Sequence, residues 1–211
     1  MSACCDHNVS EKAIPESYRR VLWIALAING TMFGVEIVAG LMGRSLSLQA
    51  DALDFFADAA NYGISLLVLG WGVKWRAGAA LFKGVAMALV GFWVFGMAVY
   101  HVQSGNVPQS EVMGIVGVLA LIANLSCAWL LYKYRSGDSN MRSVWLCSRN
   151  DAIANIAVLV AASGVWATGS GWPDVVVGAI IATLALSSAI QIIRQARIEL
   201  FTVSTEPVAG Q

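Results

Sequence analysis

The 211-residue sequence is far more apolar, and far less charged, than that of an ordinary water-soluble domain. Hydrophobic residues make up 58% of it and charged residues only 12%, and its mean hydropathy is +0.68; these values exclude an ordinary soluble domain and are typical of a membrane protein. Thirteen Lys and Arg residues balance thirteen Asp and Glu residues, so the charge predicts neither a nucleic-acid-binding surface nor an acidic interaction tail.

Six apolar runs follow one another along the chain and predict six transmembrane helices. Each has about 20 residues or more, which is the length that crosses a hydrocarbon core of about 30 Å. All four prolines lie outside these runs, where they remove no helical hydrogen bond. The predicted helices cover residues 21–43, 46–71, 79–103, 112–132, 143–168 and 175–193. We therefore expect an all-α membrane protein with a tail at 1–20, a six-helix transport domain at 21–195 and a short tail at 196–211.

The basic residues indicate how the helices are oriented, because Lys and Arg gather in cytoplasmic connections. Arg44 is alone on one side of the predicted bundle. On the other side lie Lys12, Arg19, Arg20, Lys74, Arg76, Lys83, Lys133, Arg135, Arg142, Arg194 and Arg197. This asymmetry predicts that both termini are cytoplasmic, in a multi-pass protein of a bacterial inner membrane.

Several charged residues fall inside the predicted helices. They are Glu36 in the first helix, Asp51, Asp54 and Asp58 in the second, and Arg149 and Asp151 in the fifth. An acidic or basic residue at the centre of a spanning helix costs about 2.5–3.5 kcal/mol on insertion scales, so such a residue marks a functional site by default.

The spacing of these residues predicts a site between two helices. Asp54 and Asp58 are four residues apart and Asp51 extends the same helical face, while Cys147 and Asp151 repeat the spacing in the fifth helix. The helical rise places Asp58 roughly 16–18 Å below the outer end of its helix and Asp151 roughly 12–15 Å above the inner end of its own, so the two levels meet near mid-membrane. Four ligands from two helices suit a tetrahedral cation site, at the depth that alternating access requires.

Other polar residues allow two interpretations each. Asp51 either helps to admit metal from outside or is hydrated or caps a turn, and Asn155, which continues the Cys147–Asp151 face, either supports the ligands or is a hydrogen-bonded core residue. Arg149 either reaches the inner headgroups or pairs with Glu36. For the lone His101 an interfacial position without function is favoured.

A cluster near the N-terminus combines the residue types that bind transition metals. Cys4, Cys5 and His7 lie within a Cys-Cys-Asp-His run of the polar tail. They either capture metal transiently or have no function, as is common for short polar tails.

Three stretches resemble the cation diffusion facilitator family, which exports divalent transition metals in exchange for protons. Residues 29–58 look like that family's signature across the first two helices, residues 140–162 are similar to its fifth helix, and Gly171-Trp172-Pro173-Asp174 looks like the start of its sixth. In the first stretch the matching residues are Asn29, Glu36, Gly40, Ser45, Leu46, Leu48, Asp51, Asp54 and Asp58. The resemblance covers about residues 20 to 200.

The resemblance implies four ligands, Asp54, Asp58, Cys147 and Asp151, with Glu36, Asp51 and Asn155 near the site or on the path to it. Many zinc-transporting members have His where this chain has Asp54 and Cys147. Three carboxylates and a thiolate keep Zn²⁺ plausible, favour the softer Cd²⁺ more than an all-oxygen site would, and argue against Mg²⁺ or Ca²⁺. The expected substrates are thus Zn²⁺ or Cd²⁺ and protons, with no organic cofactor and no nucleic-acid partner.

The family usually continues into a cytoplasmic ferredoxin-like domain that strengthens a homodimer, and the 17 residues after Arg194 leave no room for one. We therefore expect a homodimer held through membrane helices, either with Gly84, Gly91 and Gly96 of the third helix at the contact or with these glycines serving ordinary packing inside one subunit.

The expected function is metal efflux by proton antiport. Clustered carboxylates in a low dielectric cannot all be ionised, so an entering divalent cation displaces protons and later protonation releases the cation. The alternative is a cation channel or a small-solute proton antiporter that uses the acidic face of the second helix. An intramembrane aspartyl protease would also use two aspartates, but neither Asp58 nor Asp151 lies in the Tyr-Asp or Gly-x-Gly-Asp context of such enzymes.

Overall fold

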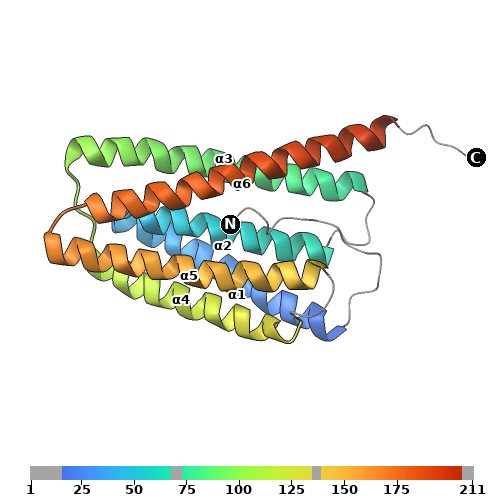
Figure 1. The fold of residues 1–211 in the computed structure, drawn as a ribbon, viewed down its shortest axis with the longest axis horizontal. Helices are drawn as coiled ribbons and strands as arrows, with labels where there is room; N and C mark the ends of the chain where they lie inside the picture. Colours follow the sequence, from blue (N-terminus) through green and yellow to red (C-terminus); the bar gives the residue numbers. More distant parts are fainter. Residues whose placement is uncertain (1–15, 68–72, 135–138, 206–211) are drawn as a thin grey trace, which may run out of the picture.

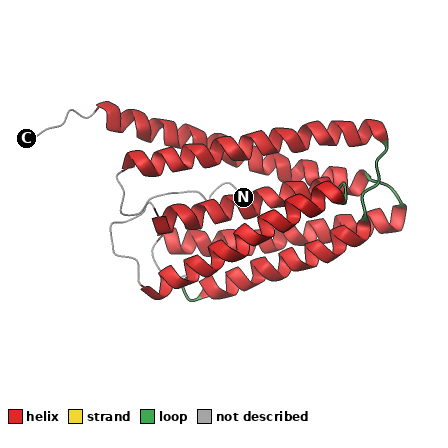
Figure 2. Cartoon of the chain, turned by 180° about the vertical axis from the view of Figure 1, so that it is seen from behind, coloured by secondary structure: helices red, strands yellow, loops and turns green. Residues whose placement is uncertain are grey.

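A computed structural model describes residues 16–67, 73–134 and 139–205 of the chain. In these ranges it contains six α-helices and no strand (Figures 1 and 2). The helices are α1 (Glu16–Met42), α2 (Leu46–Leu67), α3 (Val73–Ser104), α4 (Ser110–Tyr132), α5 (Ser139–Thr168) and α6 (Trp172–Thr205). They run back and forth along one long axis, so that α1 begins and α6 ends at the same end of the bundle.

Five of the helices are long and apolar enough to span a membrane. The candidate spans among the described residues are Glu16–Met42, Ala77–Ser104, Ser110–Tyr132, Ser148–Thr168 and Trp172–Phe201. Only α2, which carries Asp51, Asp54 and Asp58, is absent from this set. These findings confirm the predicted all-α membrane fold.

Five helices are longer than the hydropathy predicts, and α3 and α6 differ most. α3 begins at Val73 instead of residue 79, and α6 continues to Thr205, well past the predicted end at residue 193. The added segments contain Lys74, Arg194 and Arg197, whose charges lower the hydropathy without breaking a helix. Most of the segment that we expected to be a C-terminal tail, residues 196–205, is thus helical.

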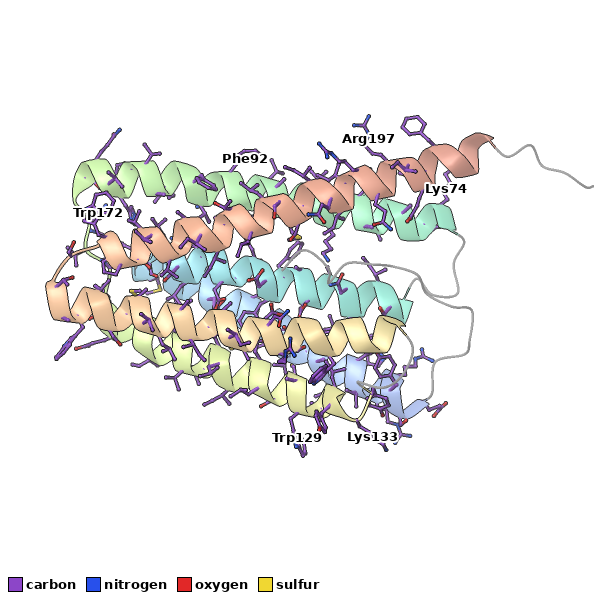
Figure 3. The ribbon with its side chains drawn as sticks, in the orientation of Figure 1. Lys74, Phe92, Trp129, Lys133, Trp172 and Arg197 are labelled. Atoms are coloured by element: carbon purple, nitrogen blue, oxygen red, sulfur yellow. The ribbon has the colours of Figure 1, made fainter. Side chains whose placement is uncertain are left out.

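The faces that the bundle turns outward are apolar. Large hydrophobic side chains are exposed on α1, α3, α4, α5 and α6, among them Phe92 and Trp129, which project on different sides in Figure 3. An exposed apolar surface of this extent is what lipid tails cover in a membrane protein. Lys74, Lys133 and Arg197 lie toward the end where α1 begins (Figure 3), in keeping with the predicted charge asymmetry.

Lys83 is an exception to that asymmetry. We assigned it to the basic connection between the second and third helices, but it lies well inside α3 and its side chain is only 1% exposed. That assignment was wrong, because the position of a basic residue in sequence does not show whether a neighbouring helix covers it. Lys83 therefore adds nothing to the surface charge of that end.

α2 is the central helix of the bundle. It packs against all five other helices, and every residue from Leu46 to Leu53 is buried. A helix that is covered all round needs no lipid-compatible face. Asp51 lies in this covered stretch, and Asp58, farther along α2, is also buried.

Close approach of backbones holds the first half of α2 in place. A Cβ atom at Gly40 of α1 would lie 2.8 Å from Cγ of Gln49, and one at Gly178 of α6 would lie 2.8 Å from the carbonyl carbon of Leu46. Gln49 also donates from Nε2 to the carbonyl oxygen of Gly40 at 3.2 Å. Small residues at these crossings let three helices meet at short distance.

The glycines of α3 are used differently from one another. A Cβ at Gly84 would meet Ile193 and Ile192 of α6, and one at Gly91 would meet Leu186, also of α6. These two glycines therefore serve packing inside one subunit and not the dimer contact that we considered. Gly96 has no neighbouring atom within 4 Å of such a Cβ.

A buried carboxylate fastens the start of α2 to the start of α6. Asp174, which is 0% exposed, accepts hydrogen bonds from Oγ of Ser45 at 2.7 Å, from the backbone N–H groups of Leu46 and Ser47 at 2.6 and 3.0 Å, and from Oγ of Ser47 at 2.6 Å. A helix N-terminus leaves N–H groups without partners and favours a negative charge. Asp174 supplies both the acceptors and the charge.

We predict that Asp174→Ala destabilises the protein by about 2–4 kcal/mol, because it leaves several buried donors without an acceptor. The apparent melting temperature of the purified protein in detergent should fall by about 5–10 °C. Glu111→Ala is the matched control, since Glu111 is an exposed acidic residue in the first turn of α4 and its loss should leave the melting temperature within about 2 °C. Equal melting temperatures for the two variants would contradict the role of Asp174.

Candidate metal site

Two of the predicted ligands meet at the interface of α2 and α5. Asp58 of α2 is 5% exposed, and its carboxyl group lies within hydrogen-bonding reach of the carboxyl group of Asp151 in α5. Asp151 is partly buried. The structure thus brings together the second member of each predicted i, i+4 pair.

A tyrosine and a serine hold the Asp58 carboxylate. The hydroxyl of Tyr62, one turn along α2, donates to Oδ2 of Asp58 at 2.9 Å, and Oγ of Ser148 lies 3.0 Å from the same hydroxyl. Because the Tyr62 proton is used on Asp58, Ser148 is the donor in the second bond. This chain of bonds fixes the carboxylate across the α2–α5 interface.

The other two predicted ligands are placed by their helices. Asp54 lies one turn before Asp58 in α2, is partly buried, and is close enough to Glu36 of α1 to act on it electrostatically. Cys147 belongs to α5, four residues before Asp151, but its side chain is outside the described part of the structure. Among the side chains that are described, no three His, Cys, Asp or Glu residues form a group that could hold a metal ion.

A second pair of carboxyl groups lies between α1 and α2. Glu36 and Asp51 are 0% and 1% exposed, and their carboxyl groups are within hydrogen-bonding reach of each other. No described donor bonds to either oxygen of Glu36 or to Oδ2 of Asp51. Because ionised carboxylates only accept, a hydrogen bond between the two requires a proton on one of them. Asp51 is therefore neither hydrated at the surface nor available as a simple turn cap.

Asn155 supports the main chain of α5 beside Asp151. It is fully buried, and its Nδ2 donates to the backbone carbonyl of Asp151 at 3.0 Å. Its Oδ1 has no hydrogen-bond partner in the described structure. Asn155 thus contacts the residue it was predicted to support, through the backbone and not through the carboxylate.

Arg149 points away from the acidic interior. It is exposed, donates to Oδ1 of Asn150 at 3.1 Å, and its guanidinium carbon lies 5.4 Å from the ring centroid of Trp145. This arrangement agrees with a guanidinium that reaches the membrane surface over an aromatic ring. The described contacts do not pair it with Glu36.

His101 lies near the end of α3, where the sequence placed it, and neighbouring residues cover its side chain. It is 4% exposed, near the end of α3, and its Nδ1 has no hydrogen-bond partner in the described structure. It lines a cavity of about 220 Å³ together with Asn106, Ser170 and Trp172. That cavity lies at the end of the bundle where α6 begins, so it is separate from the meeting point of Asp58 and Asp151.

Cys4, Cys5 and His7 lie outside the described residues.

Sequence reasoning missed four residues around Asp58. Tyr62 and Ser148 form the hydrogen-bonded chain described above, and Lys83 of α3 donates from Nζ to Oδ1 of Asn61 in α2 at 2.5 Å. A signal for Tyr62 was present, because it continues the Asp54–Asp58 spacing by one further turn, and Ser148 lies three residues before Asp151. Lys83 belongs to α3, and only the packing of α3 against α2 brings it to Asn61.

Comparison with known proteins gives a consistent result. Residues 22–201 match the family model of the cation efflux transmembrane domain. The chain is 30% identical over 179 residues to the metal cation efflux system protein CzcD of Cupriavidus metallidurans, covering 79% of this chain and 57% of that protein. It is 25% identical over 198 residues to the zinc transporter ZitB of Yersinia pestis, covering 88% of this chain and 64% of that protein.

A third relative is the cadmium, cobalt and zinc/H(+)-K(+) antiporter of Bacillus subtilis, 25% identical over 201 residues that cover 86% of this chain and 62% of that protein. The chain thus spans less than two thirds of the length of each of these relatives, and the family-model match at residues 22–201 extends from α1 into α6. With a family match over most of its length, this multi-pass membrane chain belongs to the cation diffusion facilitator family and covers its transmembrane part.

Proposed function

We propose that this protein exports divalent transition-metal cations, Zn²⁺ or Cd²⁺, from the cytoplasm by proton antiport. The ion would be held by Asp54 and Asp58 of α2 and by Cys147 and Asp151 of α5. The observation that carries the proposal is the meeting of Asp58 and Asp151 between these helices. By the helical rise, Asp58 lies about 14 Å from the end of α2 and Asp151 about 18 Å from the start of α5, which places both deep in the bundle.

The substrate follows from the ligand types. Three carboxylates and a thiolate suit a tetrahedral site for a borderline or soft divalent ion. The names of the relatives agree with this choice, since one is a zinc transporter and another a cadmium, cobalt and zinc/H(+)-K(+) antiporter. The softer thiolate in place of an imidazole favours Cd²⁺ beside Zn²⁺.

Proton exchange follows from the crowding of acids. Glu36, Asp51 and Asp58 are buried, and Asp54 and Asp151, on the helices that carry the proposed ligands, are partly buried. In such surroundings neighbouring carboxylates hold protons until a cation arrives, and metal binding releases protons from its ligands. Protonation from the far side then competes with the metal and releases it. The Glu36–Asp51 pair supplies a second place for a proton next to the ligands.

The setting of this cycle is also part of the proposal. The basic residues at one end of the bundle support cytoplasmic termini in a bacterial inner membrane, and the family supports a homodimer. Because Gly84 and Gly91 already contact α6, the dimer contact uses another part of the exposed apolar surface.

We predict that Asp58→Asn and Asp151→Asn each abolish metal transport. Each change removes a charged ligand and should weaken Zn²⁺ binding by more than about 100-fold, since even the loss of a group that supports a ligand costs 10–100-fold. The measurement is uptake of Zn²⁺ or Cd²⁺ into proteoliposomes against a pH gradient. Glu111→Gln, on an exposed helix start, is the control and should transport at the wild-type rate. Undiminished transport by either aspartate variant would remove the site assignment.

We predict that Cys147→His shifts the preference of the protein from Cd²⁺ toward Zn²⁺ by about tenfold, because imidazole is a harder ligand than thiolate. Calorimetric competition between the two ions measures the shift. Co²⁺ provides a second readout, since wild-type protein should show a thiolate charge-transfer band that Cys147→Ser lacks. An unchanged preference together with no such band would mean that Cys147 is not a ligand. That result would favour a channel or a small-solute antiporter, neither of which needs a thiolate ligand.

A further inference from the structure

The proposed cycle makes no use of the most deeply buried basic residue that the structure describes. Lys83 is 1% exposed and lies within the candidate span Ala77–Ser104 of α3. A lysine at this depth costs about 2.5–3.5 kcal/mol on insertion scales and persists where protein groups balance its charge. Its surroundings should therefore contain acceptors and negative charge.

Both are supplied by α2. The Lys83 ammonium donates to Oδ1 of Asn61 at 2.5 Å, and Asn61 lies three residues after Asp58, which is one helical turn. The Asp58 carboxylate is near enough for an electrostatic interaction with the Lys83 ammonium. The ammonium is thus directed toward the acidic region and not toward the membrane surface.

Lys83 also lies at the depth of the proposed ligands. Val73 begins α3 and Leu67 ends α2 at the same end of the bundle (Figure 1). By the helical rise, Lys83 is about 15 Å from the start of α3 and Asp58 about 14 Å from the end of α2. Since α2 and α3 are packed against each other, the amine and the carboxylate share one level of the bundle.

We propose that Lys83 is a tethered cation of the metal site, which balances carboxylate charge when no metal is bound and opposes the divalent ion when one binds. This inference rests on the proposed function. It assigns Lys83 a role in setting how tightly the site holds its substrate, whereas Asp54, Asp58, Cys147 and Asp151 would hold the ion itself.

The sign of the effect follows from electrostatics. A fixed positive charge in the same low-dielectric region repels a divalent cation, and even with an effective dielectric constant of about 20 this repulsion weakens binding by at least about tenfold over separations of several ångströms. A transport site gains from such weakening, because binding must be strong enough to load the ion and weak enough to release it. A residue that only anchored Asn61 would not produce this effect.

The test uses the full-length chain, purified in detergent. Lys83→Met replaces the ammonium with an apolar side chain of similar length, Lys83→Arg keeps the charge, and Lys74→Met removes an exposed charge from the first turns of the same helix. Zn²⁺ affinity is measured by calorimetry at about pH 8, well above the usual range of Asp, so that protons compete little. Circular dichroism and gel filtration establish that each variant is folded, and Lys83→Gln takes the place of Lys83→Met if the latter is not.

We expect Lys83→Met to bind Zn²⁺ at least about tenfold more tightly than wild type, with Lys83→Arg and Lys74→Met within about threefold of it. In proteoliposomes Lys83→Met should show a lower KM and a lower maximal rate, because release becomes slower. If Lys83 only anchored Asn61, its loss would not raise the affinity for Zn²⁺ while lowering the maximal transport rate.

Two contrary outcomes are distinguishable. If wild type binds Zn²⁺ in a manner that Asp58→Asn abolishes, while folded Lys83→Met binds it with unchanged or weaker affinity, the role of Lys83 is wrong and the proposed function stands. If wild type shows no Zn²⁺ binding that depends on Asp58, the proposed function is wrong and the role of Lys83 falls with it.

Discussion

Charged side chains are stable inside a bilayer only where the protein shields them from the lipid tails. The central position of α2 provides this shielding. Its five neighbouring helices turn their large apolar side chains outward and enclose a helix that carries three aspartates. Water is scarce there and interactions between charges are strong. The pairing of Glu36 with Asp51, the hydrogen-bonded chain from Asp58 through Tyr62 to Ser148, and the contact of Lys83 with Asn61 are all consequences of that enclosure.

The sequence predicted the membrane class, the six helices and the two i, i+4 pairs, Asp54–Asp58 and Cys147–Asp151, because hydropathy and helical spacing are local properties. It placed Asp58 opposite Asp151 through an argument from depth, and the structure brings them together. It could not place Lys83, whose burial depends on how α3 packs against α2, and it did not identify the partly buried ring of Trp145 as the partner of Arg149. The ends of α3 and α6 were also missed, since charged helical turns beyond the hydrocarbon leave no hydropathy signal.

The carboxyl groups around the candidate site differ in burial and in hydrogen bonding. Asp51 and Glu36 lie in a wholly buried pair, Asp58 is held by a tyrosine hydroxyl, and Asp54 and Asp151 are only partly buried. Groups of one chemical type, on α1, α2 and α5, thus have different surroundings. Such differences allow neighbouring carboxyl groups to hold protons and cations unequally, which coupled exchange requires.

The Asp174 carboxylate has a mechanical consequence. Because it binds the first residues of α2 while being part of the first turn of α6, and because Gly178 leaves no space between the two backbones there, the starts of these helices cannot separate without breaking several buried bonds. A rearrangement that turns the aspartates of α2 from one side of the membrane to the other must therefore carry α6 along. The starts of the two helices would then move together as one rigid unit, joined by the Asp174 carboxylate.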